Sequence, residues 1–479
     1  MFEPAIWQDD PPCGHRVAHP FQTHYCTYIR APRLLTLQCP LTSSRSEMLF
    51  LAAHQTFELW FKVILADLRA AAGTRSDVTL ETTKLLQRDV RLLRLLIAQA
   101  DLVETVLLTN PGRQLTFHPV KGVRSRQFDA LDVALRSLEE DFASAPADDV
   151  LSHLAELRLV RGYFSERFTK LLSLAPGHNG YTRDEYLQLD VLLTLQDGPK
   201  DAWTPVDELP QALAASEPVG PDQLMFIVVH QAFEIWFRVL LEHIDEARLV
   251  LLANPPNVPR AVQVLQRVVG LQRFLRDQIS IPTTMLPMDF LKFRDETKTE
   301  GGVTYRRGLA PSSGTESYQF REVEIASGLR QDEGYLALLH GADGMNFQPL
   351  TERQRQRLQE PTLAEAFATA LRNRGVDNVD DIFAPADVHN PMADLQQLAD
   401  LLLEYDEYFR FWRLSHVSMV ERMIGGKSGT GDFGPEYLKE TVGVNAAWRK
   451  RMLAPSQQRP RFFESLWEAR TRMKPTSAA

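Results

Sequence analysis

The sequence predicts an all-α protein, a helical bundle made of two tandem related units. Apolar residues recur with the period of an α-helix over long stretches, whereas the β-branched alternating runs typical of strands are scarce. One pattern also occurs twice: residues 50–65 read FLAAHQTFELWFKVIL and residues 226–241 read FIVVHQAFEIWFRVLL, and LLTLQ precedes each copy. An internal repeat of this kind indicates a duplicated structural unit.

The first unit is expected to comprise residues 1–176. It begins with an irregular arm over residues 1–22. Helical periodicity then predicts helices at 46–71, about 79–107, 126–142 and 148–173. The segment APGHNG near 175–180 contains the proline and glycines that are typical of a boundary between elements.

The second unit is expected to comprise residues 177–479. It opens with a helix in DEYLQLDVLLTLQ, and a proline-containing loop follows. Further helices are predicted at about 221–253, 258–280, 315–330, 362–374 and 394–425, with a glycine-rich loop at 295–314 and a basic, polar tail.

Composition is that of an ordinary soluble globular protein. Hydrophobic residues make up 44% and charged residues 24% of the chain, which is enough to bury a large core. The net charge of −9 argues against a nucleic-acid partner, because such a partner usually requires a basic surface. The three cysteines, Cys13, Cys26 and Cys39, lack the spacing of a zinc site and favour a reducing, cytoplasmic location. We expect neither a signal peptide nor a membrane span.

Each copy of the repeat places a histidine on an aromatic helix face. His54 lies among phenylalanines, and His230 occupies the same position in the second copy. A glutamate follows each histidine at i+4, Glu58 and Glu234, and this spacing lets a carboxylate orient an imidazole. Such an imidazole is suited to holding an indole or phenol group and to exchanging a proton. The alternative is a pair of core histidines that the duplication preserved for packing.

A further histidine lies in FRFWRLSHVSMVERMIGGKSGTG, residues 409–431. His416 shares a helix face with Phe409, Trp412 and Val420. A lone histidine on such a face is usually a core residue. A proximal haem ligand is presented in the same way, with apolar walls for the porphyrin. Spacing alone leaves both interpretations open.

Five segments of the second unit follow one another in the order and approximate spacing of a known family. They are YLQLDVLL (186–193), MFIVVHQAFEIWF (225–237), MDFLKFRD (288–295), PSSGTESYQFR (311–321) and FWRLSHVSMVERMIGGKSGTG (411–431). On these segments the unit resembles the tryptophan 2,3-dioxygenase family. The resemblance implies an all-helical, cytosolic, homotetrameric enzyme with haem b as its cofactor. It also implies that O2 is inserted into the indole 2,3-bond of L-tryptophan to give N-formylkynurenine.

The resemblance implies a role for each matching residue. His416 resembles the proximal ligand of the haem iron, and His230 resembles the distal, catalytic histidine that hydrogen-bonds the indole N–H. The other matching positions belong to the substrate pocket: Phe226 as an aromatic wall, Ser313 and Gly314 as the lining loop, and Thr430 as the hydroxyl that meets the substrate ammonium.

The family holds the substrate carboxylate with an arginine, for which this sequence offers two candidates. Arg294, in FRD, matches the family's helix, whereas Arg306, in YRRGLAPSSG, matches the loop before PSSG. A planar guanidinium suits a planar carboxylate in either place. We prefer Arg294, because a helix end fixes position better than a loop. The family's GTGGSSG is also replaced by GTGDFG, which adds Asp432 and Phe433 beside the pocket.

The first unit keeps the arm of the family but not its haem site. Tyr25 and Tyr28 form the family's YxxY pair, which in the second unit is Arg183 and Tyr186. PSSG and GTG are absent from the first unit, and Gly162 falls where the haem histidine is expected. Because the family's arm covers the pocket of a neighbouring subunit, we predict that the first unit acts as the second unit's built-in neighbour. The fused chain is then a pseudo-dimer with one haem, and two chains form a homodimer.

Three functions are compatible with these residues. The leading one is haem-dependent dioxygenation of L-tryptophan or a tryptophan derivative. The first alternative is a haem-dependent monooxygenase of an aromatic amino acid or indole metabolite in a secondary pathway, which the altered pocket loop motivates. The second is a non-catalytic haem-binding protein. Retention of His230, Thr430 and an arginine argues against the last of these, because haem alone would not require them.

Overall fold

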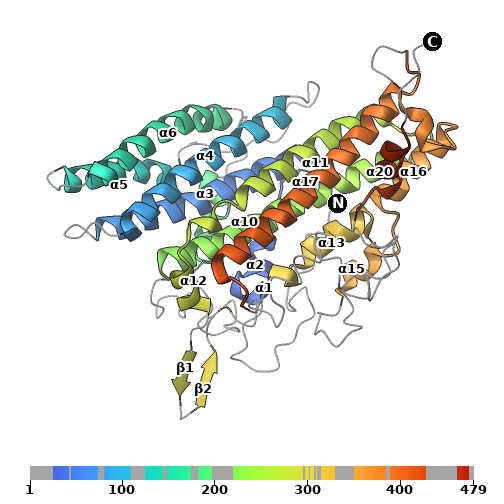
Figure 1. Ribbon diagram of the computed structural model, residues 1–479. Coiled ribbons are helices and arrows are strands. Elements are labelled where there is room, and N and C mark those ends of the chain that lie inside the picture. The colour runs from blue at the N-terminus through green and yellow to red at the C-terminus, as the bar shows by residue number, and fades with distance from the viewer. Residues whose placement is uncertain are drawn as a thin grey trace.

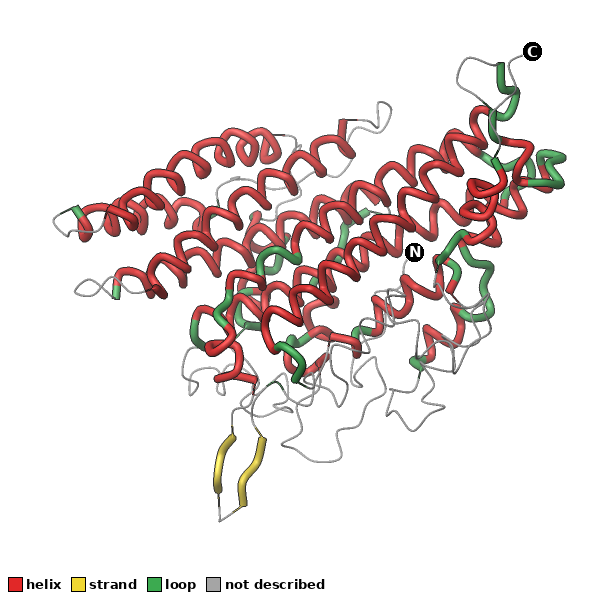
Figure 2. The backbone as a smooth tube through the Cα atoms, viewed as in Figure 1, coloured by secondary structure: helices red, strands yellow, loops and turns green. Residues whose placement is uncertain are grey.

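Long helices make up nearly all of the described structure, a computed structural model of the chain (Figures 1 and 2). It describes residues 25–42, 45–73, 80–108, 125–143, 148–173, 182–196, 219–294, 297–300, 303–306, 309, 314–329, 350–384, 389–427 and 461–473. Within these ranges the one sheet is a two-stranded antiparallel hairpin of β1 (Thr297–Glu300) and β2 (Val303–Arg306). The predicted all-α class is confirmed.

Two groups of long helices lie side by side in Figure 1. The N-terminal group consists of α3 (Arg45–Ala72), α4 (Leu80–Leu108), α5 (Arg126–Phe142) and α6 (Asp148–Ser173). The C-terminal group consists of α10 (Pro221–Leu252), α11 (Val258–Gln278), α13 (Tyr318–Ser327), α16 (Leu363–Asn373) and α17 (Ala393–Ile424). The repeated helices α3 and α10 pack against each other and join the groups. Within each group the contacts also correspond, since α4 packs on α3 and α6 as α11 packs on α10 and α17.

Short elements flank these groups. They are α1 (Tyr25–Tyr28), α2 (Ala31–Thr36), α7 (Arg183–Tyr186), α8 (Leu189–Leu192), α12 (Pro287–Arg294), α15 (Glu352–Arg357), α20 (Glu464–Arg472) and the 3-10 turns η1 (Pro282–Thr284), η2 (Gly314–Glu316) and η4 (Val379–Ile382). The helices α1 and α2 begin the described chain, yet they pack on elements of its C-terminal half. α2 packs on α10, and α1 packs on η2. Conversely, α8 packs on α3.

The long helices follow the predicted bounds, whereas two shorter segments do not. α5 and α6 span the predicted residues, and the other long helices differ only at their ends. The helix expected over residues 184–196 is interrupted at Gln188, whose φ of 53° is left-handed, so α7 and α8 are separate. The loop expected at 295–314 contains the β1–β2 hairpin. The predicted irregular segment, residues 1–22, lies outside the described residues; the arm of the first unit is α1 and α2, and that of the second unit is α7 and α8.

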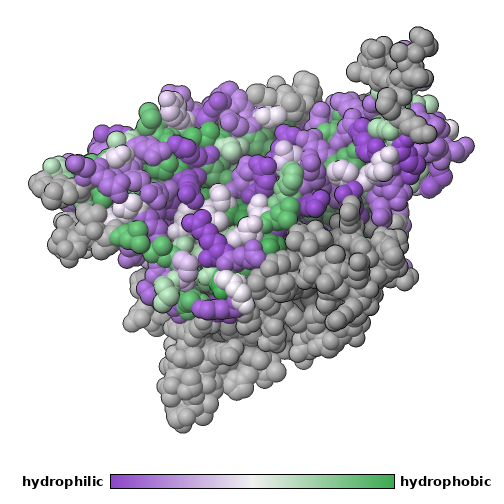
Figure 3. Space-filling view, viewed as in Figure 1, coloured by the Kyte–Doolittle hydropathy of each residue, from purple (hydrophilic) through white to green (hydrophobic). Residues whose placement is uncertain are grey.

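The repeated helices α3 and α10 form the centre of the core. Each is long and apolar enough to cross a membrane by length and composition, yet 94% and 83% of their most apolar windows are buried within the protein. The core helix of a soluble protein has the same property. On the face shown in Figure 3, hydrophilic residues are spread over the outer helices and apolar residues lie among them in smaller patches.

A buried ionic cluster joins the two helix groups. Arg88 of α4 is fully buried and binds both carboxylate oxygens of Asp67 on α3, at 2.7 and 2.5 Å. The same guanidinium also donates to Asp222 in the first turn of α10. Lys84, one turn earlier on α4, donates to Asp222 at 2.9 Å. The charge of Arg88, in the N-terminal group, is therefore balanced partly by Asp222 of the C-terminal group.

Candidate functional site

A cavity open to solvent lies between the arm, α10, α13 and α17, and its empty space, with the solvent at its mouth included, is about 790 Å³. The apolar part of its wall includes Val229, Phe233, Phe237, Ile279, Phe320 and Met419. Two histidines, His230 and His416, open on the same cavity from α10 and α17.

His230 presents one nitrogen to the cavity. Its Nδ1–H donates to the carbonyl oxygen of Phe226 at 2.7 Å, so Nε2 is left as an acceptor. Burial lowers the pKa of His230 to about 4, and the imidazole is therefore neutral at neutral pH. A Cβ placed on Gly314 would lie 3.8 Å from Nε2. A side chain at this position would therefore stand in van der Waals contact with the acceptor nitrogen.

Lowered histidine pKa values make a testable contribution to stability. His243 of α10 is buried outside the cavity, and burial lowers its pKa to about 4. An unfolded histidine has a pKa of about 6.5. The unfolded chain therefore binds more protons as the pH falls through this window, and the stability present above pH 6.5 is progressively lost down to pH 4. For His243 alone the loss between pH 7 and pH 5 is roughly 2 kcal/mol.

We expect the His243→Gln variant to lose less unfolding free energy than the wild type between these two pH values. Urea unfolding at pH 7 and pH 5 measures both losses. Parallel losses in the two proteins would contradict a lowered pKa for His243.

His416 faces the cavity from the C-terminal half of α17. Its ring stacks on Trp412, with ring centroids 5.5 Å apart. Burial, with a smaller contribution from His230, lowers the pKa of His416 to about 4. The cavity thus contains two neutral imidazoles, and a neutral imidazole is the form that binds a metal ion.

Aromatic rings surround His230 on its own helix and on the arm. The ring of Phe226 lies 4.3 Å from that of His230, and Tyr25 of the arm meets His230 edge-on at 5.7 Å. Tyr28 contacts Phe226 in turn, at 6.4 Å. Phe293 of α12 packs on the same ring at 5.4 Å. The structure therefore brings Tyr25 to the histidine of the other half of the chain and Tyr28 to Phe226 on the same helix, and of the predicted pocket residues Tyr25, Tyr28 and Phe226 only Tyr25 lines the cavity.

The expected pairing of Glu234 with His230 is wrong. The carboxylate of Glu234 accepts hydrogen bonds from the Tyr25 hydroxyl at 2.9 Å and from Gln319 Nε2 at 2.7 Å. The arm and α13 pack on α10 beside Glu234 and supply these donors, while the Nδ1–H of His230 is engaged by the Phe226 carbonyl. Burial raises the pKa of Glu234, and these hydrogen bonds oppose the shift.

A charged cluster completes the cavity wall near His416. Arg413 of α17 forms an ion pair with the buried Glu324 of α13, and Arg321 pairs with the same carboxylate at 3.2 Å. All three side chains line the cavity. The resemblance to the family assigns no role to these three residues, although Arg321 ends the matching segment PSSGTESYQFR.

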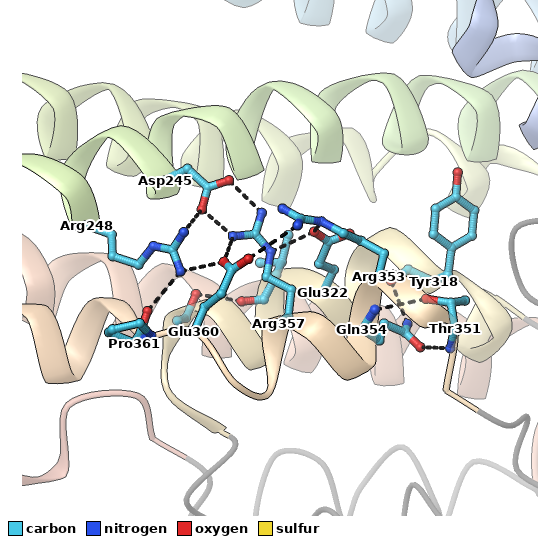
Figure 4. Close-up of polar contacts among 12 residues, drawn as sticks. Asp245, Arg248, Tyr318, Glu322, Thr351, Arg353, Gln354, Arg357, Glu360 and Pro361 are labelled. Carbon is cyan, nitrogen blue, oxygen red and sulfur yellow. Dashed lines mark hydrogen bonds and ion pairs between the residues drawn. The ribbon is translucent and has the colours of Figure 1, made fainter. Parts of the chain in front are cut away.

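An ionic network holds α13 against α10 and α15 (Figure 4). Arg357 of α15 is buried and pairs with Asp245 of α10 and, at 2.7 Å, with Glu322 of α13. Arg353 reinforces the contact to Glu322 at 3.1 Å. Because α13 supplies Phe320, Arg321 and Glu324 to the cavity, this network fixes one wall of the site.

The remaining predicted site residues lie at or beyond the edge of the described structure. Arg294 ends α12, is buried, and does not line this cavity. Arg306 ends β2. Gly314 begins η2 and lines the cavity. Ser313 and Thr430 lie outside the described residues, as do Asp432 and Phe433.

The corresponding place in the N-terminal group is filled by aromatic side chains. His54 of α3 is buried, with Phe50 at 4.0 Å and Phe168 of α6 at 6.1 Å. Phe164 and Phe168 of α6 pack into the space beside α3. Gly162, expected in place of a haem histidine, is exposed on α6. Burial, aided by Arg183, holds the pKa of His54 well below its usual value.

Comparison with known proteins points to one family. The family model described as Tryptophan 2,3-dioxygenase matches residues 12–143, 174–379 and 387–449. A tryptophan 2,3-dioxygenase of Nocardioides sp. is 37% identical over an alignment of 249 positions, which covers 49% of this chain and 87% of that protein. Another, of Herpetosiphon aurantiacus, is 31% identical over an alignment of 280 positions, which covers 54% of this chain and 93% of that protein. Each relative is thus matched over most of its length by about half of this chain.

Proposed function

Because the chain belongs to the tryptophan 2,3-dioxygenase family and is thereby an oxygenase, we propose that it inserts O2 into the indole 2,3-bond of L-tryptophan or a tryptophan derivative. One observation carries this proposal: two neutral histidines, His230 and His416, face one largely apolar cavity, and Tyr25 borders it beside His230. An acceptor nitrogen within aromatic walls suits an indole N–H. The product expected from L-tryptophan is N-formylkynurenine.

The residues of the cavity fit haem b. His416 offers a neutral imidazole, the form in which histidine binds a haem iron, and Trp412 stacked beside it gives the cavity an apolar wall there. Among the described residues, no group of three or more His, Cys, Asp or Glu side chains could hold a metal ion. A cofactor that brings its own ring nitrogens therefore suits this site better than a bare ion. When bound, haem supplies the activation of O2.

The protein's own contribution is to bind and orient the substrate. His230 Nδ1–H is engaged by Phe226, so Nε2 accepts the hydrogen bond from the indole N–H. Tyr25 lines the cavity beside His230 and the ring of Phe226 packs against the imidazole, so apolar surface surrounds the histidine and disfavours water there. Specificity for an N–H donor follows, because a substrate without one leaves the buried acceptor unpaired.

The polar end of the substrate is assigned by resemblance. We propose Arg294, rather than Arg306, as the residue that binds the carboxylate. Its place at the end of α12 supports this choice, because the preceding Phe293 packs on Phe226 beside His230. Thr430 is proposed for the ammonium group and Ser313 for the lining loop.

We also propose that residues 1–176 and 177–479 form a pseudo-dimer in which the arm of the first unit covers the haem site of the second. Reciprocal hydrogen bonds of the two repeated glutamines support the proposal. Gln231 Nε2 donates to the carbonyl oxygens of Ile29 and Leu195, and Gln55 Nε2 donates to those of Leu37 and Leu187. Each glutamine thereby joins the segment before its own helix to the arm of the other unit. A homodimer of such chains in the cytoplasm completes the proposal.

Turnover under labelled O2 tests the function. Purified protein loaded with haem and supplied with L-tryptophan is expected to form a ring-opened product that carries two labelled oxygen atoms, measured by mass spectrometry. A product with one labelled atom would instead identify a monooxygenase. Haem binding without any product from a panel of indole amino acids would identify a non-catalytic haem protein.

A further inference from the structure

Two buried glutamates occupy the same place in the two copies of the repeat. Glu58 of α3 and Glu234 of α10 each follow a histidine at i+4. Each accepts hydrogen bonds from a glutamine of a later helix in its group that packs on it. Gln127 of α5 donates to the carbonyl and carboxylate of Glu58, and Gln319 of α13 donates to those of Glu234.

The second partner of each carboxylate comes from the other half of the chain. The Tyr25 hydroxyl donates to Glu234 at 2.9 Å across 209 residues. Arg183 forms an ion pair with Glu58 at 2.6 Å. Tyr25 and Arg183 begin the corresponding short helices α1 and α7. The two arms thus dock in the same way, with a tyrosine in one and an arginine in the other.

On the basis of the proposed function, we propose that Glu234 is a positioning residue for the reaction: it holds Tyr25 and Gln319 together and so closes the cavity beside His230. Both partners belong to walls of the cavity. Tyr25 lines it directly, and Gln319 precedes Phe320 and Arg321 in the first turn of α13. The backbone N–H of Tyr25 also donates to Glu316 of η2, at 2.9 Å. One buried carboxylate therefore ties the arm and α13 to the histidine helix.

A carboxylate is suited to this position because it only accepts. Tyr25 and Gln319 both present donors, and the two oxygens of Glu234 receive one each. A glutamine at 234 retains one acceptor and adds an amide donor that faces another donor. The arm is then held less firmly while the volume of the side chain is preserved.

The test compares Glu234→Gln, Tyr25→Phe and their double variant in the haem-loaded, full-length protein. Each single change is expected to raise KM for L-tryptophan roughly 10-fold, the effect of losing one buried hydrogen bond, with kcat changed by less than about 2-fold. The double variant is expected to resemble the singles, because both changes remove the same interaction. Hydrogen exchange of residues 25–30 is expected to quicken in Glu234→Gln.

Glu58→Gln is the matched control. It alters the same residue type at the corresponding buried position, where the neighbouring cavity is filled by phenylalanines. It is expected to leave KM for L-tryptophan unchanged. An equal rise in KM for Glu58→Gln would show a general structural effect and overturn the proposal, as would fully additive effects of Glu234→Gln and Tyr25→Phe.

The exchange measurement separates this inference from the proposed function. If the wild-type protein does not act on L-tryptophan, the proposed function fails, and exchange of residues 25–30 still decides whether Glu234 holds the arm. Unchanged exchange of the arm in Glu234→Gln overturns the positioning role even if turnover is observed.

Discussion

The His416→Ala variant is expected to fold but to bind no haem. The imidazole of His416 is neutral, faces the cavity and stacks on Trp412, and alanine removes the proposed bond to the iron. Loss of an outer-shell partner alone lowers metal affinity roughly 10- to 100-fold, so loss of the ligand itself is expected to cost more. The haem content and Soret spectrum of the purified protein measure the effect, and far-ultraviolet circular dichroism checks the helices.

A second histidine provides the control for this experiment. His54 is also buried on an aromatic helix face, but Phe164 and Phe168 fill the space beside α3. His54→Ala is therefore expected to keep one haem per chain. A His416→Ala protein with an unchanged Soret spectrum would show that the ligand assignment is wrong. In a His416→Gly variant, added imidazole is expected to restore the spectrum, because the cavity then has room for the free ligand.

The fold was predictable from sequence wherever a helix buries one continuous face. α5 and α6 begin and end at the predicted residues because their apolar period and polar flanks are both local signals. The break between α7 and α8 has another cause. Gln188 takes a left-handed φ of 53°, and its side chain donates to the carbonyl of Leu37 in the other arm at 3.3 Å. Contacts distant in sequence therefore outweigh the helical pattern of residues 184–196.

The same distinction between local signals and contacts distant in sequence applies to the residues of the cavity. His230 and His416 were recognisable because each lies on a long helix whose apolar face is evident in the sequence. The partner of Glu234 was not, because Tyr25 is 209 residues away and reaches it only after the arm crosses to the other helix group. The spacing along α10 suggested His230 as the partner of Glu234, because it is the nearest polar group in sequence. Tertiary packing instead supplies the Tyr25 hydroxyl as the donor.

The filled site of the N-terminal group shows how one copy could lose a cavity and keep its fold. Phe164 and Phe168 of α6 contact Phe57 of α3 at 5.6 and 5.2 Å. Aromatic side chains bury large areas, so the packing of these rings fills the space that a cofactor would otherwise occupy. The sequence signalled the loss through a missing histidine at Gly162 and the absence of PSSG and GTG. It did not reveal that Gly162 is exposed, or that the phenylalanines two and six residues beyond it fill the core.

Replacing Arg88 with alanine is expected to lower the free energy of unfolding by about 3–5 kcal/mol, the usual cost of removing one partner from a buried ion pair. Arg88 is fully buried and binds Asp67 of α3 and Asp222 of α10. Without the guanidinium, Asp67 is a buried carboxylate with no compensating charge from Arg88, and the contact between the helix groups is weakened. Urea unfolding, with the midpoint and its slope both fitted, measures the loss.

Arg94→Ala is the control on the same helix. Arg94 pairs with Glu156 at 2.7 Å, and both side chains are largely exposed, at 63% and 43%. Exposed pairs contribute about 0–1 kcal/mol, so this change is expected to have little effect. Equal losses in the two variants would show that burial of the Arg88 cluster adds nothing to stability. A large loss confined to Arg88→Ala, with an unchanged unfolding slope, would instead place the junction of the two helix groups among the strongest determinants of the folded state.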